Sequence, residues 1–455
     1  MLGKNRDICK IKKAFHIMIL GGGHSGLAVG FYAKKNGMPF KIYEASNHIG
    51  GNSITLKHGD FLFDSGAHRF HNKYPEVTKE IKNLLGEDFM KLNVPGQIYH
   101  NGKFLYFPFS ILNLIKNLGL YTSTKVLVEL MNSRFTTREL DKNFENFVLH
   151  TYGKTIGNHF LFNYSEKLWG ISCNKLSPDI AGERMKGLNL KTLFTEVIFG
   201  QKANSEHMEG SFYYPKTGIG AIAEKLGKFC GEENILLNSR VTKIFHNRER
   251  IQAVEINSEK RIETYELVSA LPINLFLHMM EPKPPNEVLQ SANYLSYRNL
   301  ILVALFLNRE SVTNASTVYF PDSNLPFTRV YEPKNRSVKM SPRGKTSLIV
   351  EIPCRQGDKF WSLKEEKIIQ LIRSQFIKIG FIKEEEIIDA SVVKMNFAYP
   401  ILEIGYKDKV KKINTFLKSF SNLKITGRNG RFTYAWIHDM IKFGKEIIEE
   451  YMSFK

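Results

Sequence analysis

The sequence predicts an α/β fold organised around one βαβ unit near the start of the chain. An apolar segment at 16–20 is followed by the glycine-rich turn GGGHSG at 21–26 and by helical spacing of apolar residues over 27–36. A second short apolar segment at 40–43 then ends on Glu44. Strand, glycine turn, helix, strand and acid stand in the order of a Rossmann-type dinucleotide-binding domain.

Each position of the glycine turn has a physical reason. Gly21 permits a tight turn, Gly23 lets the backbone approach a pyrophosphate, and Gly26 lets the helix pack closely on the strand. The N-terminus of the helix offers free N–H groups and a positive dipole end to the phosphates. Glu44 can accept hydrogen bonds from a ribose hydroxyl. We therefore expect a bound dinucleotide.

A second glycine turn narrows the choice of dinucleotide. HIGGN at 48–52 and FDSGAHRFH at 63–71 follow closely behind Glu44. A nicotinamide dehydrogenase does not need a second glycine turn at this point. The pattern resembles the FAD-binding segments of the superfamily of amine oxidases, protoporphyrinogen oxidases and UDP-galactopyranose mutases, and it resembles the mutases most. The resemblance implies that FAD is the cofactor.

Helical and strand-like segments alternate beyond this opening. An amphipathic helix is expected at 75–85, and a hairpin with an Asn-Gly turn at 98–108. Residues 109–148 have helical spacing, with an apolar stripe between 111 and 118. Such a stripe can lie on a membrane, but core packing is the interpretation that we favour.

The second half of the chain begins with strands. Residues 235–272 alternate as short strands, and the apolar run at 300–307 is too short to span a bilayer and indicates a buried strand. Ser362 and Glu365 have the spacing of a capping box, which predicts a helix that runs from there to about 379.

Five further segments resemble the same superfamily, chiefly the longer eukaryotic mutases. They are NYSEKLWG at 163–170, GERM at 182–185, FYYPKTGIG at 212–220, TVYFPDSNLPFTR at 317–329 and GRNGRFTY at 427–434. Two features depart from the mutase pattern. Arg69 is charged where the mutases usually carry an apolar residue, and KTG at 216–218 replaces a more glycine-rich turn.

The resemblance implies a glutathione-reductase-like, Rossmann-type FAD-binding domain with an inserted mixed α+β substrate domain. The FAD-binding domain is expected to comprise 1–75, 216–282 and 401–455. A mostly helical substrate or cap region is expected at 76–215, and the sheet and helix of the substrate domain at 283–400.

The resemblance also implies a site residue by residue. In the mutases the tryptophan that matches Trp169 stacks on uridine, and the arginines that match Arg184 and Arg329 face a diphosphate. The implied catalytic residues are His68, Arg184 and Arg329, and the implied substrate-binding residues are Asn163, Trp169, Tyr319 and Tyr434. The implied FAD-binding residues are Gly21, Gly23, His24, Ser25, Gly26, Glu44, Gly50, Gly51, Asn52, His68, Val241, Gly427 and Arg428.

Two functions are consistent with this resemblance. The first is a mutase (an isomerase) that acts on a nucleotide-diphosphate sugar, a UDP-sugar by the resemblance, through the flavin N5 atom in cell-surface glycan biosynthesis. Its chemistry needs cations beside a diphosphate whose charge grows as it leaves. The second is an oxidoreductase, similar to amine oxidases or protoporphyrinogen oxidases, that removes hydride from a small or lipid-linked substrate in an apolar pocket. A basic, non-catalytic flavoprotein that binds membranes is a weaker alternative.

Composition limits the class of protein. A net charge of +19 and a pI near 9.5 would suit an acidic partner, but the lysines are scattered, so we expect solvated surfaces and no nucleic-acid partner. Four distant cysteines without a C-x-x-C pair predict no metal site and fit a reducing cytoplasm. No signal peptide or transmembrane segment is expected, and peripheral contact with the inner face of the membrane is left open.

Overall fold

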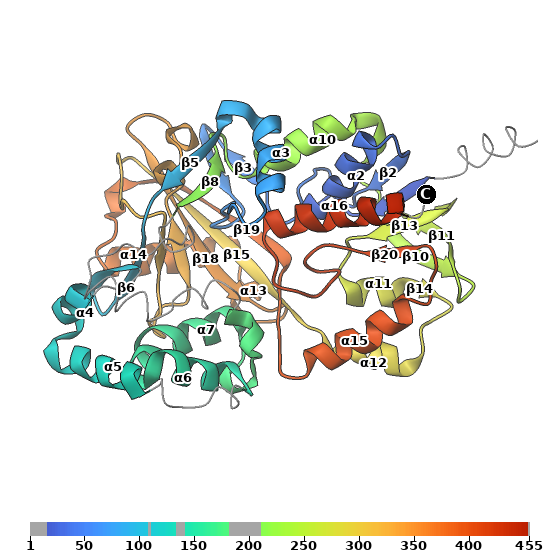
Figure 1. Ribbon diagram of the computed structural model, residues 1–455. Helices are drawn as coiled ribbons and strands as arrows, with labels where there is room; N and C mark the ends of the chain where they lie inside the picture. Colours follow the sequence, from blue (N-terminus) through green and yellow to red (C-terminus); the bar gives the residue numbers. More distant parts are fainter. Residues whose placement is uncertain (1–15, 108–110, 133–141, 182–210, 454–455) are drawn as a thin grey trace, which may run out of the picture.

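The computed structural model describes residues 16–107, 111–132, 142–181 and 211–453 (Figure 1). A parallel sheet has the order β20-β13-β1-β2-β9. Its strands are β1 (Ile17–Leu20), β2 (Phe40–Tyr43), β9 (Ile235–Leu236), β13 (Glu266–Ser269) and β20 (Leu423–Ile425). The chain therefore returns to this sheet from three distant parts of the sequence, and the predicted α/β fold is confirmed.

Three helices pack together beside the parallel sheet: α2 (His24–Lys35), α10 (Gly220–Cys230) and α16 (Ile437–Ser453). The contact between α16 and α2 is close, because a Cβ on Gly444 would lie 2.6 Å from the Ala28 Cβ and 2.8 Å from the Val29 nitrogen. Helix α2 begins three residues earlier than the spacing predicted, at His24, directly after Gly23.

The second large sheet is mixed and has seven strands, in the order β19-β15-β18-β17-β16-β6-β7. Its strands are β6 (Gly96–His100), β7 (Lys103–Phe107), β15 (Tyr297–Leu307), β16 (Thr317–Tyr319), β17 (Arg329–Tyr331), β18 (Thr346–Cys354) and β19 (Ile387–Pro400). The predicted hairpin is confirmed, with φ of 49° at Asn101 and 79° at Gly102. The apolar run at 300–307 is confirmed as a buried strand.

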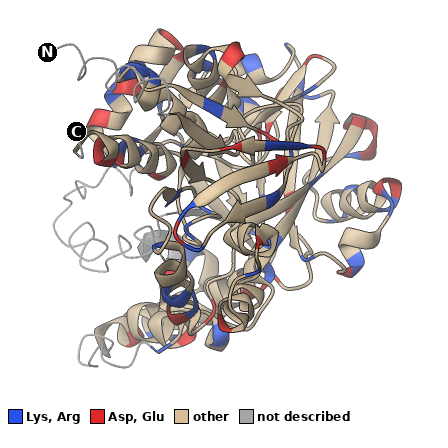
Figure 2. Cartoon of the chain, turned by 90° about the vertical axis from the view of Figure 1, so that its right-hand side faces the viewer, with Lys and Arg blue, Asp and Glu red and all other residues tan. Residues whose placement is uncertain are grey.

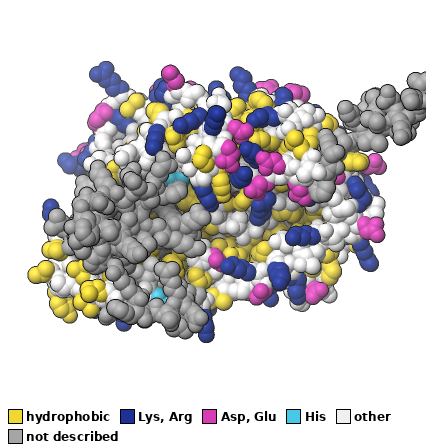
Figure 3. All heavy atoms as spheres, viewed as in Figure 1, with side chains coloured by type: hydrophobic (Ala, Val, Ile, Leu, Met, Phe, Trp, Pro, Cys, Tyr) yellow, Lys and Arg dark blue, Asp and Glu magenta, His cyan; other side chains and the backbone are white. Residues whose placement is uncertain are grey.

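A helical region lies beside the far end of this sheet, at the lower left of Figure 1. It comprises α4 (Ile111–Leu118), α5 (Leu120–Asn132), α6 (Phe144–Ile156), the π-helical turn Gly157–Leu161 and α7 (Phe162–Trp169). In the apolar stripe, Leu118 packs against the core. The side chains of 111–114 lie outside the described residues. On α5, by contrast, Leu120, Tyr121, Val128 and Met131 are exposed, and apolar side chains gather there in Figure 3.

The remaining elements connect these layers. The remaining strands are β3 (Thr55–His58), β4 (Phe61–Asp64), β5 (Phe89–Asn93), β8 (Ser211–Pro215), β10 (Val241–His246), β11 (Ile251–Ile256), β12 (Lys260–Glu263) and β14 (Met280–Glu281). The remaining α-helices are α3 (Pro75–Leu85), α11 (Ile273–Met279), α12 (Asn286–Tyr294), α13 (Lys359–Ser362), α14 (Glu365–Lys378) and α15 (Tyr406–Leu417). The amphipathic helix predicted at 75–85 is confirmed as α3.

The predicted capping box is wrong. Helix α14 does form, but its N-cap is Lys364 and no side chain caps it. Ser362 instead ends the short helix α13, and its hydroxyl donates to the Asp358 carbonyl oxygen at 3.3 Å. Ser362 lies two residues before the N-cap of α14, so its hydroxyl cannot cap this helix and bonds to the preceding turn instead.

Charged residues of both signs are spread along the described helices and strands rather than gathered by sign. Figure 2 shows Lys and Arg interspersed with Asp and Glu over the helices and strands. None of the helices in the described ranges is both long enough and apolar enough to cross a membrane.

Candidate active site

The glycine turn brings α2 into close contact with the end of β1. A Cβ on Gly26 would lie 1.9 Å from the Gly21 carbonyl oxygen, so no other residue fits there without moving the backbone. Gly21 itself has φ of 101°, a conformation that L-residues rarely adopt. Gly23 differs, because the nearest atom to its added Cβ is the Gly51 Cα at 3.8 Å. Space therefore remains beside Gly23, at the N-terminus of α2.

Glu44 is positioned by backbone groups at the end of β2. One carboxylate oxygen accepts the Gly22 N–H at 2.6 Å and the other accepts the Ser46 N–H at 2.8 Å. The side chain is nearly buried. These contacts fix the carboxylate at the edge of the glycine turn, where the second strand of a Rossmann-type domain holds the acid for a ribose.

The second glycine turn lies directly against the first. The Gly50 N–H donates to the Gly22 carbonyl oxygen at 2.9 Å, and Gly23 and Gly50 form a parallel β-bridge. Gly50 and Gly51 have φ of 104° and 60°. Asn52 follows, and its amide donates to the Asn396 and Phe397 carbonyl oxygens at 3.0 Å each. The two turns thus form one continuous backbone surface beside α2.

Two buried polar atoms at this surface have no hydrogen-bond partner within the described ranges. They are Nε2 of His24 and Nε of Arg428. The loop that carries Arg428 reaches the glycine turn, because a Cβ on Gly427 would lie 3.5 Å from Ser25. Buried polar groups normally find partners. The phosphate and ring oxygens of FAD would supply acceptors here, so these residues fit the predicted cofactor.

Burial lowers the pKa of His24 to about 4, and the charge of Arg428 acts in the same direction. The folded protein without FAD therefore keeps His24 neutral at pH values where the unfolded chain binds a proton. We expect its free energy of unfolding to fall as the pH drops from 6.5 towards 4, by up to about 1.4 kcal/mol per pH unit from this one group.

Denaturant unfolding of FAD-free protein across this pH range checks the expectation. His24→Gln should remove this contribution, so that the free energy of unfolding falls less steeply with decreasing pH, by up to about 1.4 kcal/mol per pH unit. If the free energy of unfolding depends on pH equally in wild type and His24→Gln, His24 does not titrate as its burial requires.

A buried ion pair connects the glycine turn before His68 with the mixed sheet. The Arg329 Nε donates to Glu351 at 2.5 Å, and the other carboxylate oxygen of Glu351 accepts the Ala67 N–H at 2.8 Å. The Arg329 Nη2 donates to the Tyr399 hydroxyl at 2.8 Å. Although burial acts against the charge, Glu351 holds the pKa of Arg329 well above its ordinary value. Arg329 is thus a permanent cation within the protein.

His68 lies between this ion pair and the second glycine turn. Its Nε2 is 3.2 Å from the Asn52 carbonyl oxygen, to which a neutral imidazole donates. Burial lowers the pKa of His68 well below its ordinary value, and Arg428 and Arg329 lower it further. The fully buried Arg336 supports the backbone here, because its Nη1 donates to the His68 carbonyl oxygen at 2.8 Å.

Aromatic rings pack around Tyr399, the hydrogen-bond partner of Arg329. The ring of Trp169 lies 6.2 Å from Tyr399 and 5.9 Å from Tyr434, both edge-on. The guanidinium of Arg428 lies 5.5 Å from the centre of the Tyr399 ring. Burial raises the pKa of Tyr399 to about 12, so its hydroxyl stays protonated at neutral pH. Two cations and three amphipathic rings therefore share one region.

The structure gives fewer contacts for the other predicted site residues. Tyr319 contacts Tyr164 at 5.9 Å and interacts electrostatically with Arg329. Asn163 is exposed on α7, and Val241 is buried at the start of β10. Arg184 lies outside the described residues, so the predicted convergence of two arginines can be followed only from Arg329.

Sequence reasoning missed Glu351, Tyr399 and Lys167. Glu351 could have been noticed in the sequence, since it is the one charged residue of β18 and stands within the apolar segment at 348–353. Lys167 lies in the mutase-like segment at 163–170, but the sequence does not show which groups its ammonium contacts. Its Nζ donates to the carbonyl oxygens of Phe320, Asp322, Leu325 and Phe327, at 2.6, 2.8, 3.1 and 3.0 Å. It thereby ties α7 to the loop that leads into Arg329.

Replacing Lys167 by methionine should destabilise this loop. Four carbonyl oxygens would lose their donor, and we expect the free energy of unfolding to fall by about 2–3 kcal/mol. Lys154→Met, at an exposed position on α6, should change it by less than about 0.5 kcal/mol. Denaturant unfolding of the two variants tests this, and equal stabilities would contradict the anchoring role.

Comparison with known proteins agrees with this geometry. The model of the family described as flavin containing amine oxidoreductase matches residues 24–407. Coproporphyrinogen III oxidase of Bacillus subtilis (strain 168) is 21% identical, with 96% of this chain and 98% of that protein covered. Mitochondrial protoporphyrinogen oxidase of Nicotiana tabacum is 22% identical over 58% of this chain and 55% of its own length.

Solved structures show the same fold. A crystal structure of reduced UDP-galactopyranose mutase superposes with a TM-score of 0.85 at 19% identity, covering 97% of this chain and 94% of that one. A putative protoporphyrinogen oxidase from Exiguobacterium sp. 255-15 has a TM-score of 0.76 at 14% identity, covering 97% and 99%. The family match spans most of the sequence, and the two glycine turns, Glu44 and the partnerless atoms of His24 and Arg428 suit its cofactor. The chain therefore belongs to the flavin-containing amine oxidoreductase family and is an FAD-dependent enzyme.

Proposed function

We propose that this enzyme acts on a nucleotide-diphosphate sugar as a mutase, in the manner for which UDP-galactopyranose mutase is named. The observation that carries the proposal is the charge of the site. Arg329 is held as a permanent cation by Glu351, and the guanidinium of Arg428 lies 5.5 Å from the centre of the Tyr399 ring. A diphosphate is an anion that two guanidinium groups recognise well.

The residues of the chain would have separate tasks in this reaction. Arg329, with Arg184 as the second arginine that the resemblance implies, would bind the diphosphate and stabilise the charge that develops as it leaves the sugar, while Arg428 would face FAD. Trp169 and Tyr434 would offer rings to the uracil base or to the sugar. The protonated Tyr399 hydroxyl accepts a hydrogen bond from Arg329 and keeps its own proton for the ligand. Bound FAD would supply, in its reduced form, the nucleophile that the rearrangement of the sugar ring needs.

The alternative is an oxidase that removes hydride from its substrate. The relatives named as coproporphyrinogen III oxidases, from Bacillus subtilis and Staphylococcus aureus, favour it, because both match nearly the whole chain. For such an oxidase we expected an apolar pocket. The groups around Tyr399 are instead charged or carry a polar tip, and they include Arg428, Tyr434 and the ion pair of Arg329 with Glu351. This contrast is why the mutase reaction is the stronger proposal.

Titration with UDP tests the ligand class directly. We expect UDP to change the flavin absorbance or tryptophan fluorescence of the FAD-loaded protein. Arg329→Lys keeps the positive charge but loses the planar guanidinium and its paired N–H donors. It should weaken UDP binding by about 1.5–3 kcal/mol, or roughly ten- to a hundred-fold. Arg309→Lys alters a half-exposed arginine paired with Glu386 and should bind UDP as wild type does. A wild-type protein without any UDP response would rule out the nucleotide-sugar proposal.

A further inference from the structure

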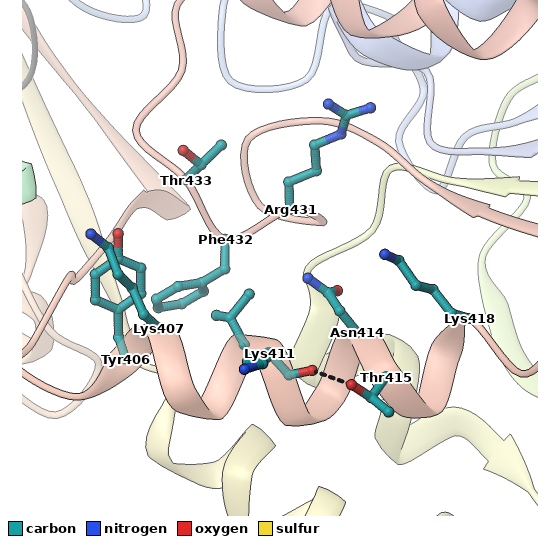
Figure 4. A pocket seen from close by; sticks show the side chains of 10 residues that line it. Tyr406, Lys407, Lys411, Asn414, Thr415, Lys418, Arg431, Phe432 and Thr433 are labelled. Atoms are coloured by element: carbon teal, nitrogen blue, oxygen red, sulfur yellow. Dashed lines mark hydrogen bonds between the residues drawn. The ribbon is translucent and has the colours of Figure 1, made fainter. Parts of the chain in front are cut away.

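A second concave site lies outside the FAD region, between α15 and the loop that follows β20 (Figure 4). Its volume is about 490 Å³, within the range of small-molecule pockets. One wall is a face of α15, and the other is the segment at 431–433. We call this site the α15 groove. It is lined by Tyr406, Lys407, Val410, Lys411, Asn414, Thr415, Lys418, Arg431, Phe432 and Thr433.

Every side chain of the α15 groove that carries a full charge at neutral pH is a cation. Two of these cations are already paired: Lys407 with Asp179 at 2.8 Å and Arg431 with Glu446 at 3.8 Å. In Figure 4 the guanidinium of Arg431 points away from α15. Lys411 and Lys418 are exposed and have no ion-pair partner in the part of the chain that the structure describes. Two uncompensated cations therefore remain.

These two lysines are spaced to act together. They lie seven residues apart on α15, which is two helical turns or roughly 10 Å along the axis, so both lie on the same face. Asn414 lies between them on this face and points toward the 431–433 segment in Figure 4. The Thr415 hydroxyl is already used, since it donates to the Lys411 carbonyl oxygen at 3.0 Å. Lys411, Asn414 and Lys418 thus form a row of donors along one wall.

The opposite wall is rigid and close to the cofactor region. Phe432 is fully buried with φ of 49°, and its ring contacts Tyr406 at 6.1 Å. The Arg431 N–H donates to the Gly427 carbonyl oxygen at 2.9 Å, and the Thr433 N–H to the Arg428 carbonyl oxygen at 3.0 Å. The wall of the groove is therefore hydrogen-bonded to Gly427 and Arg428, the residues of this loop that reach the predicted FAD site.

We propose that the α15 groove binds a small molecule that carries two or more phosphate groups. Lysine ammonium groups bind phosphate as point charges, and two of them on one face match an anion of at least two charges. The groove is open to solvent, and its volume is of the size that a small metabolite fills. The phosphates lie between Lys411 and Lys418 and accept from Asn414, while the partly exposed Val410 offers apolar contact to the remainder of the ligand. This site is separate from the one that holds the substrate of the proposed mutase.

Calorimetric titration of the FAD-loaded full chain with inorganic pyrophosphate tests the proposal. We expect one pyrophosphate to bind per chain at the groove, more weakly as salt is added. Lys411→Gln/Lys418→Gln should weaken this binding by roughly tenfold or more. The control is Lys364→Gln/Lys367→Gln, which removes two exposed positive charges at the start of α14 and should bind as wild type does.

Binding at the flavin cleft must be told apart from binding at the groove. Arg329→Lys should keep the groove binding, because Arg329 does not line the groove. No binding of pyrophosphate to wild type at millimolar concentration, equal binding by the two double variants, or loss of binding in Arg329→Lys would each overturn the proposal. Retention on anionic vesicles that pyrophosphate does not displace would also overturn it, because the lysines would then serve a lipid surface.

Discussion

Gly23→Ala should yield a folded protein that no longer retains FAD. The added Cβ would lie 3.8 Å from its nearest neighbour, an ordinary contact, and the backbone at Gly23 has φ of −73° and ψ of 177°, which alanine adopts freely. The methyl group would, however, occupy the space through which the pyrophosphate approaches the N-terminus of α2. Loss of two charge-assisted hydrogen bonds there, each worth about 1.5–3 kcal/mol, would weaken FAD binding by a hundred-fold or more. Flavin absorbance per chain after gel filtration measures this.

Two other glycines provide the comparison, one in the same turn and one in β6. Gly26→Ala should impair folding itself, because the added Cβ would lie 1.9 Å from the Gly21 carbonyl oxygen and α2 could not pack on β1. Gly96→Ala, whose Cβ would meet Tyr319 at 3.6 Å, should keep both the fold and full FAD content. A yellow Gly23→Ala protein with normal FAD content would contradict the assignment of this turn to the pyrophosphate.

Arg329→Met should lower the free energy of unfolding by about 3–5 kcal/mol and abolish the UDP response. The loss of stability follows because Glu351 is fully buried and would remain as an unpaired carboxylate. The loss of ligand binding follows because the permanent cation beside Tyr399 is removed. Denaturant unfolding and UDP titration measure the two effects separately.

The double variant Arg329→Met/Glu351→Gln separates structure from function. It leaves no unpaired buried charge, and the amide oxygen of the substituted side chain can still accept the Ala67 N–H, so most of the stability should return. The UDP response should stay absent. If stability and UDP binding return together, Arg329 serves the fold alone and has no role in recognising a diphosphate.

The FAD region of the fold could be predicted from the sequence because its signals are local. The glycines at 21, 23 and 26, the apolar strand before them and Glu44 all lie within one βαβ unit, where each residue type has a single physical reason. Apolar spacing predicts the start of α2 three residues too late, because the first turn of the helix begins with the polar residues His24 and Ser25. The hairpin was predictable for the same reason as the βαβ unit, since an Asn-Gly pair accepts positive φ at both positions.

The substrate side could not be predicted to the same depth because its contacts are between distant residues. Glu351 joins Ala67 to Arg329 only after β17 and β18 have paired. Lys167 holds four carbonyl oxygens of a loop that lies more than 150 positions away. The capping-box prediction was wrong for a local reason. The helix begins after Lys364, and the Ser362 hydroxyl bonds to the turn before it. A single sequence shows residue types, and it does not show which of them pair in space.

The most direct test of the account is turnover of UDP-galactofuranose by the FAD-loaded protein reduced with dithionite, with oxygen consumption recorded in parallel. We predict conversion to UDP-galactopyranose that requires reduced flavin but consumes no net electrons, together with little oxygen uptake in the presence of amines or porphyrinogens. Conversion should disappear in Arg329→Met/Glu351→Gln. Absence of conversion in wild type, combined with oxygen uptake driven by a porphyrinogen or an amine, would contradict the mutase proposal and establish the oxidase in its place.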